Sequence, residues 1–335
     1  MCTSMATSAA PDSRLRGTRR SLICAALAAL RPGAAAGPEL RQRRFAVTWN
    51  VQVPAGAGQR VSLWLPVPQD DASQRIEHLV LSSPGGTRVA EGEHGNRYGY
   101  CELTAAAPRL TMSFEVTRRE HVLRPTGQPA DLPGAAESRC CLGSDRLVPV
   151  DDRIRAWARE VVGPGDRSDV EKARAIYNHV IATVKYDKTG TGWGRGDIYY
   201  ACDARRGNCT DFHAIFIGYC RAVGVPARFA IGLPLPAARG AGEIAGYHCW
   251  AEFYARGFGW VPVDASEAAK DPARRDYFFG AHDENRVELS RGRDLLLVPR
   301  QRGQPLNFFV LPYAEVEGEP LSGVTTQIRY RDRAG

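Results

Sequence analysis

The chain has 335 residues, of which 44% are hydrophobic and 24% charged. This is the composition of an ordinary folded protein, long enough for one or two domains. The formal net charge is +7, but +4 comes from residues 1–36, where five arginines stand against one aspartate. The remainder has no long basic run, which argues against a nucleic-acid-binding protein.

The first 36 residues have the pattern of an export signal. A basic segment ending in Arg19-Arg20 precedes an apolar run through Leu30, and Ala34-Ala35-Ala36 offers a small-residue cleavage site. This order is typical of a signal peptide, and the paired arginines resemble a twin-arginine signal. The apolar run has about ten residues, whereas a membrane span needs about 20. We therefore expect a mature protein that starts near Gly37, is periplasmic or secreted, and has no stable membrane insertion.

Residues 37–122 predict a small β-sandwich-like domain. Five runs have strand character and are separated by Gly, Pro and Asn-rich turns; they cover residues 45–53, 60–66, 78–82, 98–103 and 109–118. No acid pair or ligand cluster marks this region, so we expect a packing or substrate-presenting module. Residues 123–150, rich in Pro, Gly and small residues, predict a linker.

Helical patterns follow. Residues 153–162 predict a short helix ended by Gly163-Pro164, and Ser168 with Glu171 forms a capping-box pattern for a longer one. The glycine-rich run 190–196 lacks the Lys-Ser/Thr of a phosphate loop, so we expect a flexible loop on the substrate side of a cleft. Further strands are expected at residues 277–280, 295–299 and 307–313.

The most informative segment begins at Asn208. Asn208 is a good N-cap, Asp211 suits the first turn, and Gly224 ends an apolar helical face. Cys209 is then the first residue of the helix, where free N–H groups and the helix dipole favour the thiolate and can face an oxyanion. The alternative is that Cys209 is a small buried core residue.

A predicted hairpin supplies a possible base and orienting group. Residues 247–254 and 260–264 are strand-like and flank Arg256-Gly257. If the turn centres on Arg256, His248 and Asp264 face each other with Cβ atoms about 4.5–5.5 Å apart. Asp264 could then hold one imidazole nitrogen and leave the other for Cys209. A one-residue slip would separate the two side chains, and the alternative is a core histidine with a loop-capping aspartate.

A metal site is the rival chemistry. Cys209 and His213 are four residues apart on one helix and Cys202 lies seven residues before Cys209, but the close cysteine pair of structural zinc sites is missing. We expect no metal and no cofactor, with His213 packed or solvated. Seven cysteines follow residue 36, an odd number compatible with one free reactive thiol. Their connectivity stays open.

The chain resembles the transglutaminase-like superfamily of papain-type cysteine enzymes, especially bacterial transglutaminase-like enzymes and cysteine proteases. The resemblance covers roughly residues 150–290 and rests on residues 207–209 (GNC), 222–228 (AVGVPAR), 246–252 (GYHCWAE) and 259–264 (GWVPVD). It implies an α+β domain with the nucleophile helix packed on an antiparallel sheet. It also implies Cys209 as nucleophile, His248 as general base and acid, and Asp264 as the orienting residue.

The resemblance further implies a second oxyanion donor upstream of the nucleophile, an aromatic or amide side chain. Its position is open; the oxyanion or substrate-binding candidates are Tyr186, Trp193, Tyr199 and Asn208.

These observations predict a signal peptide (1–36), a β domain (37–122), a linker (123–150), a catalytic domain (151–290) and C-terminal strands completing the domain (291–335). The expected function is thiol acyl transfer, hydrolysing peptide, protein or cell-wall amide bonds through a thioester. A cross-linking enzyme that accepts amines, and a non-catalytic binding module, are the alternatives; the oligomeric state is open. The hypothesis requires the three side chains to converge, with the sulfur accessible and outside any disulfide.

Overall fold

The computed structural model describes residues 40–104, 108–127 and 140–334, and residues 40–335 form one compact unit. The predicted signal peptide and residues 128–139 of the predicted linker lie outside the described residues. Among those that are described, none of the helices is both long and apolar enough to cross a membrane.

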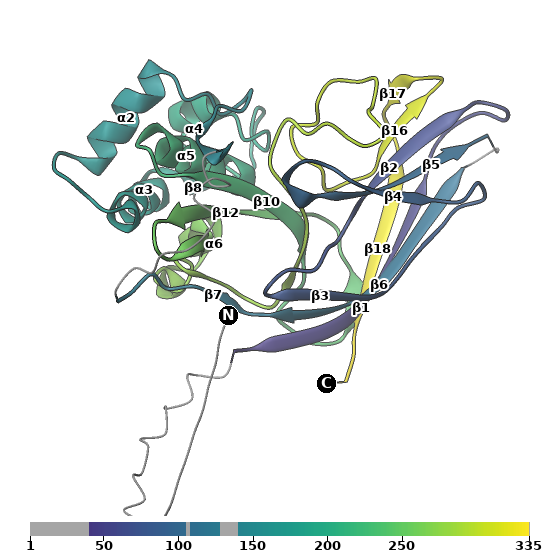
Figure 1. Cartoon of the computed structure of the whole chain (residues 1–335), viewed down its shortest axis with the longest axis horizontal. Helices are drawn as coiled ribbons and strands as arrows, with labels where there is room; N and C mark the ends of the chain where they lie inside the picture. The colour runs from purple at the N-terminus through teal and green to yellow at the C-terminus, as the bar shows by residue number, and fades with distance from the viewer. Residues whose placement is uncertain (1–39, 105–107, 128–139, 335) are drawn as a thin grey trace, which may run out of the picture. The chain divides into compact units, whose positions relative to one another are not determined.

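Two five-stranded antiparallel sheets make up one side of this unit (Figure 1). The first has the order β11 (Ala241–Glu243), β18 (Thr325–Asp332), β1 (Gln42–Gln52), β6 (Arg109–Arg119) and β3 (Gln74–Ser82). The second has the order β17 (Glu319–Leu321), β16 (Tyr313–Val316), β2 (Val61–Val67), β5 (Arg97–Leu103) and β4 (Arg88–Glu91).

The inner faces of the two sheets share one apolar core. Every second residue of β1 is buried, as expected for a strand with one face turned inward. Phe45, Trp49, Leu63 and Leu65 belong to the same buried cluster. The sandwich-like region is therefore confirmed, and all five predicted strands correspond to strands of the structure, namely β1, β2, β3, β5 and β6.

The C-terminal strands pair with the first two strands of the described chain. β18 lies antiparallel to β1, with Ile328 opposite Trp49, and β16 pairs with β2. Figure 1 shows the yellow β18 beside the purple β1. We expected residues 291–335 to complete the catalytic domain; their strands instead complete the two N-terminal sheets. Pairing between strands so distant in sequence leaves no local pattern to predict it.

The other predicted late strands are turns and loops. Residues 277–280 and 295–299 make only isolated bridges, at Phe279 and Leu295, and residues 307–312 are not in a strand. Leu295, Leu297 and Phe309 pack in a separate buried cluster with Trp64 and Tyr98. These apolar runs reflect burial, which a short run cannot distinguish from strand formation.

Helices and a third sheet make up the other side of the unit (Figure 1). The helices are α2 (Asp152–Val162), α3 (Asp169–Thr183), α4 (Ile198–Ala204), α5 (Cys209–Ala222) and α6 (Ala265–Lys270). The sheet has the antiparallel order β13 (Gly259–Val263), β12 (His248–Ala255), β10 (Ala227–Pro234) and β15 (Arg286–Arg291). Helix α5 packs on β12 and β10, which confirms the predicted α+β arrangement.

Short elements complete the described chain. β7 (His121–Val122) pairs with β14 (Ala281–His282), and β8 (Lys185–Tyr186) runs parallel to β9 (Arg206–Gly207). Three 3₁₀ turns cover Glu93–Gly95, Cys140–Leu142 and Pro272–Arg274.

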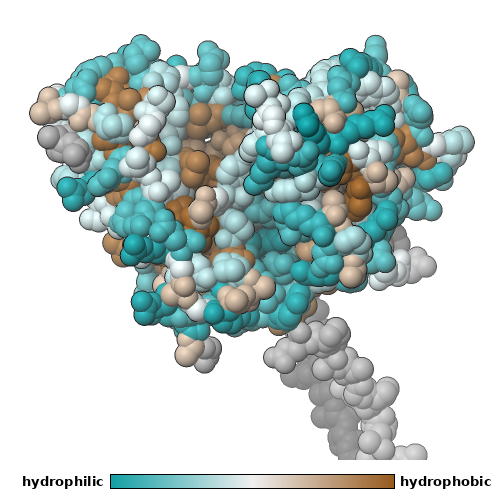
Figure 2. Space-filling view, turned by 180° about the vertical axis from the view of Figure 1, so that it is seen from behind, coloured by the Kyte–Doolittle hydropathy of each residue, from teal (hydrophilic) through white to brown (hydrophobic). Residues whose placement is uncertain are grey.

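Polar residues dominate the face shown in Figure 2, with apolar residues in several patches among them. The large apolar side chains that are exposed in the described residues are aliphatic: Leu40, Val80, Val89, Val298 and Leu311. Scattered exposed aliphatic residues are normal for a folded protein and need no partner to explain them.

Candidate active site

Helix α5 begins as the sequence predicts. The Asn208 side chain accepts a hydrogen bond from the N–H of Thr210 (2.9 Å), and Asp211 Oδ2 accepts one from the N–H of Asn208 (2.9 Å), which forms a reciprocal capping box. A Cβ at Gly207 would lie 2.2 Å from Asp211 Oδ2, so a residue without a side chain is needed for this carboxylate to fold back. The cap fixes Cys209 as the first residue of α5.

The buried carboxylate of Asp211 also holds the glycine-rich run 190–196. It accepts hydrogen bonds from the N–H groups of Gly194 (2.7 Å) and Gly196 (3.1 Å). Arg293 Nη1 also donates to the Gly196 carbonyl (2.8 Å). We expected a flexible loop; the structure shows a segment anchored to the start of α5, because Asp211 has acceptor capacity beyond its capping bond.

The β12–β13 hairpin differs from the predicted register but still joins His248 to Asp264. Ala251 lies opposite Val263 and Ala255 opposite Gly259, so the turn centres on Gly257 and not on Arg256. Asp264 is therefore a diagonal neighbour of His248 on the same face, still within reach of a long side chain. His248 Nε2 lies 2.7 Å from Asp264 Oδ2.

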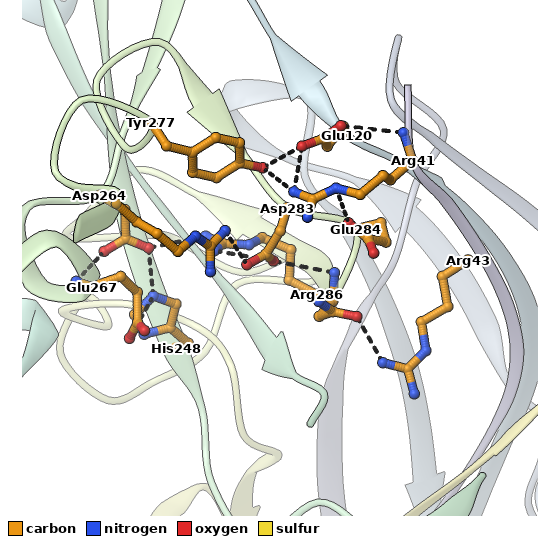
Figure 3. Close-up of polar contacts among 12 residues, drawn as sticks. Arg41, Arg43, Glu120, His248, Asp264, Glu267, Tyr277, Asp283, Glu284 and Arg286 are labelled. Carbon is orange, nitrogen blue, oxygen red and sulfur yellow. Dashed lines mark hydrogen bonds and ion pairs between the residues drawn. The ribbon is translucent and has the colours of Figure 1, made fainter. Parts of the chain in front are cut away.

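Asp264 combines the two roles that the sequence offered as alternatives (Figure 3). Its Oδ1 caps α6, accepting from the Glu267 N–H (3.0 Å) and the Ser266 hydroxyl (2.9 Å). Its Oδ2 accepts from His248 and also from Arg286 Nη1 (3.1 Å). The cap therefore fixes the carboxylate in the orientation that holds the imidazole.

A line of polar contacts runs from this carboxylate to β1. Arg286 Nη2 lies 3.5 Å from Asp283 Oδ1, which accepts from the Asn285 N–H (3.2 Å). Arg43 of β1 then donates to Asn285 Oδ1 (2.8 Å). Figure 3 follows Arg286, Asp283 and Arg43 across this junction. The sandwich-like region and the candidate site are thus joined by hydrogen bonds as well as by apolar packing.

The three candidate side chains favour charged forms. The neighbouring Cys249 side chain holds the pKa of Cys209 well below its usual value, against the opposing effect of burial, and the His248 side chain and its charge act in the same direction. Burial would lower the pKa of His248, but the charge and hydrogen bond of Asp264 raise it to about 10.

Burial likewise disfavours a charged Asp264, yet the positive charge of His248 and the nearby Arg286 hold its pKa well below the usual value. The arrangement therefore favours a thiolate beside an imidazolium that a carboxylate orients.

The thiol of Cys209 is free but largely covered. Cys101, Cys202, Cys220 and Cys249 are also free thiols. Only 2% of Cys209 and 7% of His248 is exposed to solvent. The sulfur is thus outside any disulfide, as required, but nearly closed off, so a substrate must displace a neighbouring group to reach it.

Of the four oxyanion or substrate candidates, the structure leaves Tyr186 beside the thiol. Strand β8 places Tyr186 opposite Gly207, two residues before Cys209. Burial and the charge of Cys209 raise the pKa of Tyr186, so its hydroxyl keeps the proton that it could donate. Lys270 Nζ lies 4.0 Å from the centre of the Tyr186 ring.

The other three candidates have different partners. Trp193 Nε1 donates to the Gly190 carbonyl within its own loop (3.0 Å), and the Tyr199 hydroxyl bonds to Asp151 at the start of α2. The Asn208 carbonyl oxygen caps α5, and its Nδ2 lies 3.4 Å from the Tyr247 hydroxyl. These contacts hold the three side chains within local structure, and the oxyanion or substrate role of each stays a prediction.

Three polar residues around the site were not predicted from the sequence. Arg286 lies in β15, 22 residues beyond Asp264, and no motif marks it. Glu267 Oε1 lies 3.9 Å from His248 Nε2 and 2.6 Å from Lys270 Nζ. The third residue is Cys249, which lies in strand β12. Only its place directly after His248 could have pointed to a role.

His213 is packed, with none of its surface exposed, as one of the two predicted possibilities had it. The described residues include no group of three or more His, Cys, Asp or Glu placed to hold a metal ion. Cys202, part of the metal alternative, instead lies 3.5 Å from the Tyr219 hydroxyl.

Comparison with known proteins identifies the domain around this site. Residues 155–265 match the model of the transglutaminase-like superfamily. The chain thus contains a transglutaminase-like domain, and the matched range includes Cys209, His248 and Asp264.

Two other matches cover most of the chain. A protein of Haemophilus influenzae, described as uncharacterized, is 27% identical over 322 residues, covering 83% of this chain and 86% of its own. A crystal structure from Cytophaga hutchinsonii, described as a "putative cysteine protease", has a TM-score of 0.62 at 17% identity, covering 89% of this chain and 94% of that one. The second likeness shows a shared fold that includes the sandwich-like region.

Proposed function

We propose that the protein is a cysteine acyl-transfer enzyme that hydrolyses amide bonds through Cys209, His248 and Asp264. The observation that carries the proposal is the position of His248. One ring nitrogen is held 2.7 Å from Asp264, and the ring is one of the groups that lower the pKa of Cys209, which sits at the N-terminus of α5. This division of roles is the one that thiol and serine acyl transfer share.

The reaction follows from these positions. The Cys209 thiolate adds to the amide carbonyl carbon, and the negative charge moves to the carbonyl oxygen. As the C–N bond breaks, His248 gives its proton to the leaving amine, and an acyl thioester remains on Cys209. His248 then takes a proton from water, which attacks the thioester; the products are a carboxylic acid and the regenerated thiolate.

Two donors are available for the oxyanion. The N–H groups of Thr210 and Asp211 bond to Asn208. This leaves the Cys209 N–H as the first-turn amide without a partner among the residues that the structure describes. The Tyr186 hydroxyl is the second donor that we propose. Donors fixed before the reaction stabilise the developing charge without reorganisation.

We propose peptide, protein or cell-wall amides as the substrates, because the predicted export signal would carry the enzyme to them. Since 2% of Cys209 is exposed, substrate binding must move a covering side chain such as Tyr186 or Tyr247, whose pKa values both respond to the charge of Cys209.

The test compares two cysteines of the same helix. Both Cys209 and Cys220 are buried in α5, but burial raises the pKa of Cys220 well above its usual value. Purified protein is assayed against peptide, isopeptide and peptidoglycan-fragment amides, with and without primary amines. We expect Cys209→Ala to lose turnover and Cys220→Ala to keep it. Product carrying the added amine would indicate cross-linking, and turnover by Cys209→Ala would contradict the proposal.

A further inference from the structure

A second buried thiol lies against the Cys209 thiol. Cys249 directly follows His248 in β12, and its side chain and the Cys209 thiol act on each other's pKa, lowering that of Cys209 and raising that of Cys249. None of the Cys249 surface is exposed. Two thiols in contact can share one hydrogen bond in either direction, so the direction depends on what else each sulfur contacts.

His213 decides that direction. The Ala265 N–H donates to His213 Nε2 (3.2 Å), whereas Asp264 Oδ1 lies 3.7 Å from the same nitrogen, beyond hydrogen-bond distance. Because a backbone amide can only donate, this arrangement favours an Nε2 without a proton. The proton of the neutral ring is therefore on Nδ1, which lies 3.6 Å from Cys249 Sγ. Cys249 accepts from His213 and is left with its own S–H to donate to Cys209.

Burial reinforces this order of donors. It lowers the pKa of His213, which keeps the ring neutral in spite of the nearby Asp264 and Cys209 charges. It also raises the pKa of Cys249, and the hydrogen bond with Cys209 adds to that rise. Of the two adjacent thiols, Cys249 thus stays protonated as a donor while Cys209 becomes the thiolate.

We propose that Cys249 is a positioning residue for the nucleophile: its S–H donates to the Cys209 thiolate, and His213 Nδ1–H holds the Cys249 sulfur in place. This inference rests on the proposed function, in which Cys209 is the attacking group. The bond is strongest to the free thiolate and weakens as the sulfur becomes a neutral thioester, so it sets the charge state and direction of the resting sulfur.

Other groups also act on this sulfur and must stay constant in a test. Asp211 and His213 act on Cys209 from its own helix α5. Tyr247, His248 and Cys249 act on it from β12 and the residue before that strand, and Tyr186 acts on it from β8. Changing Cys249 alone leaves the charged members of this set in place.

The experiment follows alkylation of Cys209 by iodoacetamide against pH, in the presence of a phosphine reductant, with the modified residue located by peptide mass spectrometry. We compare Cys249→Ala, Cys249→Ser and the control Cys220→Ala. Cys249→Ala should move the rise of the Cys209 alkylation rate to higher pH. At a pH where the rate of the unaltered protein is still rising, the variant should be alkylated about ten-fold more slowly. Serine should restore the profile, since a hydroxyl also donates, and Cys220→Ala should leave it unchanged.

The outcomes separate the two proposals. A low-pH profile in the unaltered protein that alanine does not shift would overturn the role of Cys249 and leave the proposed function standing. An unaltered protein whose Cys209 titrates near a free thiol, at about 8.5, would overturn the proposed function itself. If Cys249→Ala does not fold, Cys249→Val removes the donor while keeping apolar volume, and the same shift is expected.

Discussion

The sandwich-like sheets and the region around α5 belong to one compact unit but bury different kinds of side chain. In β1 and β6 the buried positions are apolar except for Arg43 and Arg118, and they alternate with half-buried or exposed ones. The first turn of α5 buries Asn208, Thr210, Asp211 and His213 instead. Buried polar groups are costly unless each has a partner, and here most are paired. Burial in the sheets therefore mainly stabilises the fold, whereas burial in α5 and the strands beside it fixes the positions of the polar side chains of the candidate site.

Replacing the His248 imidazole should have the largest effect, and the effect should appear in activity and not in folding. We expect His248→Ala to lower kcat/KM by about 10²–10⁴, the usual contribution of a general acid–base. His179→Ala, which alters a half-buried histidine of α3, serves as the control and should keep most activity. Steady-state kinetics with the best amide substrate measure both. Equal losses in the two variants would place the effect in folding and not in chemistry.

A change in the sandwich core should show the opposite pattern. Trp49 is fully buried in β1 and donates to the Thr326 hydroxyl of β18. Trp49→Ala should lower the free energy of unfolding by about 3–5 kcal/mol through the cavity that it leaves. Val89→Ala, at an exposed position of β4, should change it little. Urea denaturation gives the free energies, and kcat per folded molecule should stay the same; a lost kcat would show that the sheets shape the site directly.

The Tyr186 hydroxyl should contribute next. Tyr186→Phe keeps the ring but removes the proposed oxyanion donor, and we expect kcat to fall by about 10²–10³. Tyr199→Phe is the matched control, since its hydroxyl bonds to Asp151 away from the thiol. If both variants retain kcat, the oxyanion must rely on the Cys209 N–H and some other donor.

Substitutions at Asp264 can separate capping from orientation. Asparagine also caps helices, so Asp264→Asn should keep the cap of α6 but lose stability, because Arg286 and His248 are left without their buried counter-charge. Asp264→Ala should lose a further ~1 kcal/mol through the missing cap. Ser168→Ala, which removes the cap of α3, gives the size of a pure capping loss.

The same pair of variants tests the charge. Asp264 raises the pKa of His248 to about 10, so the imidazolium, and with it kcat/KM, should persist until the pH approaches that value. Without the carboxylate charge the pKa falls, and the alkaline decline in the pH–rate profile should begin at a lower pH in Asp264→Asn. An unmoved decline would mean that another group controls it.

Much of this molecule follows from local pattern. The five sandwich strands, the caps of α3 and α5, and the place of Cys209 could be predicted because each depends on neighbours within a few residues. The His248–Asp264 contact was predicted in spite of a wrong turn centre. Moving the turn centre by one residue changes the partner of each residue by two positions. Both side chains therefore stay on one face, where a diagonal contact is still possible.

The sequence by itself determined which residue types stand at the site and which short elements hold them, since propensity, capping and period are local. Tertiary structure alone decided that residues from the two ends of the chain pair in the same sheets, that Arg286 reaches Asp264, and that Cys249 and His213 stand behind the thiol. These contacts join positions 22 to almost 290 residues apart. At such separations chain periodicity carries no information, and packing of the whole unit selects the partners.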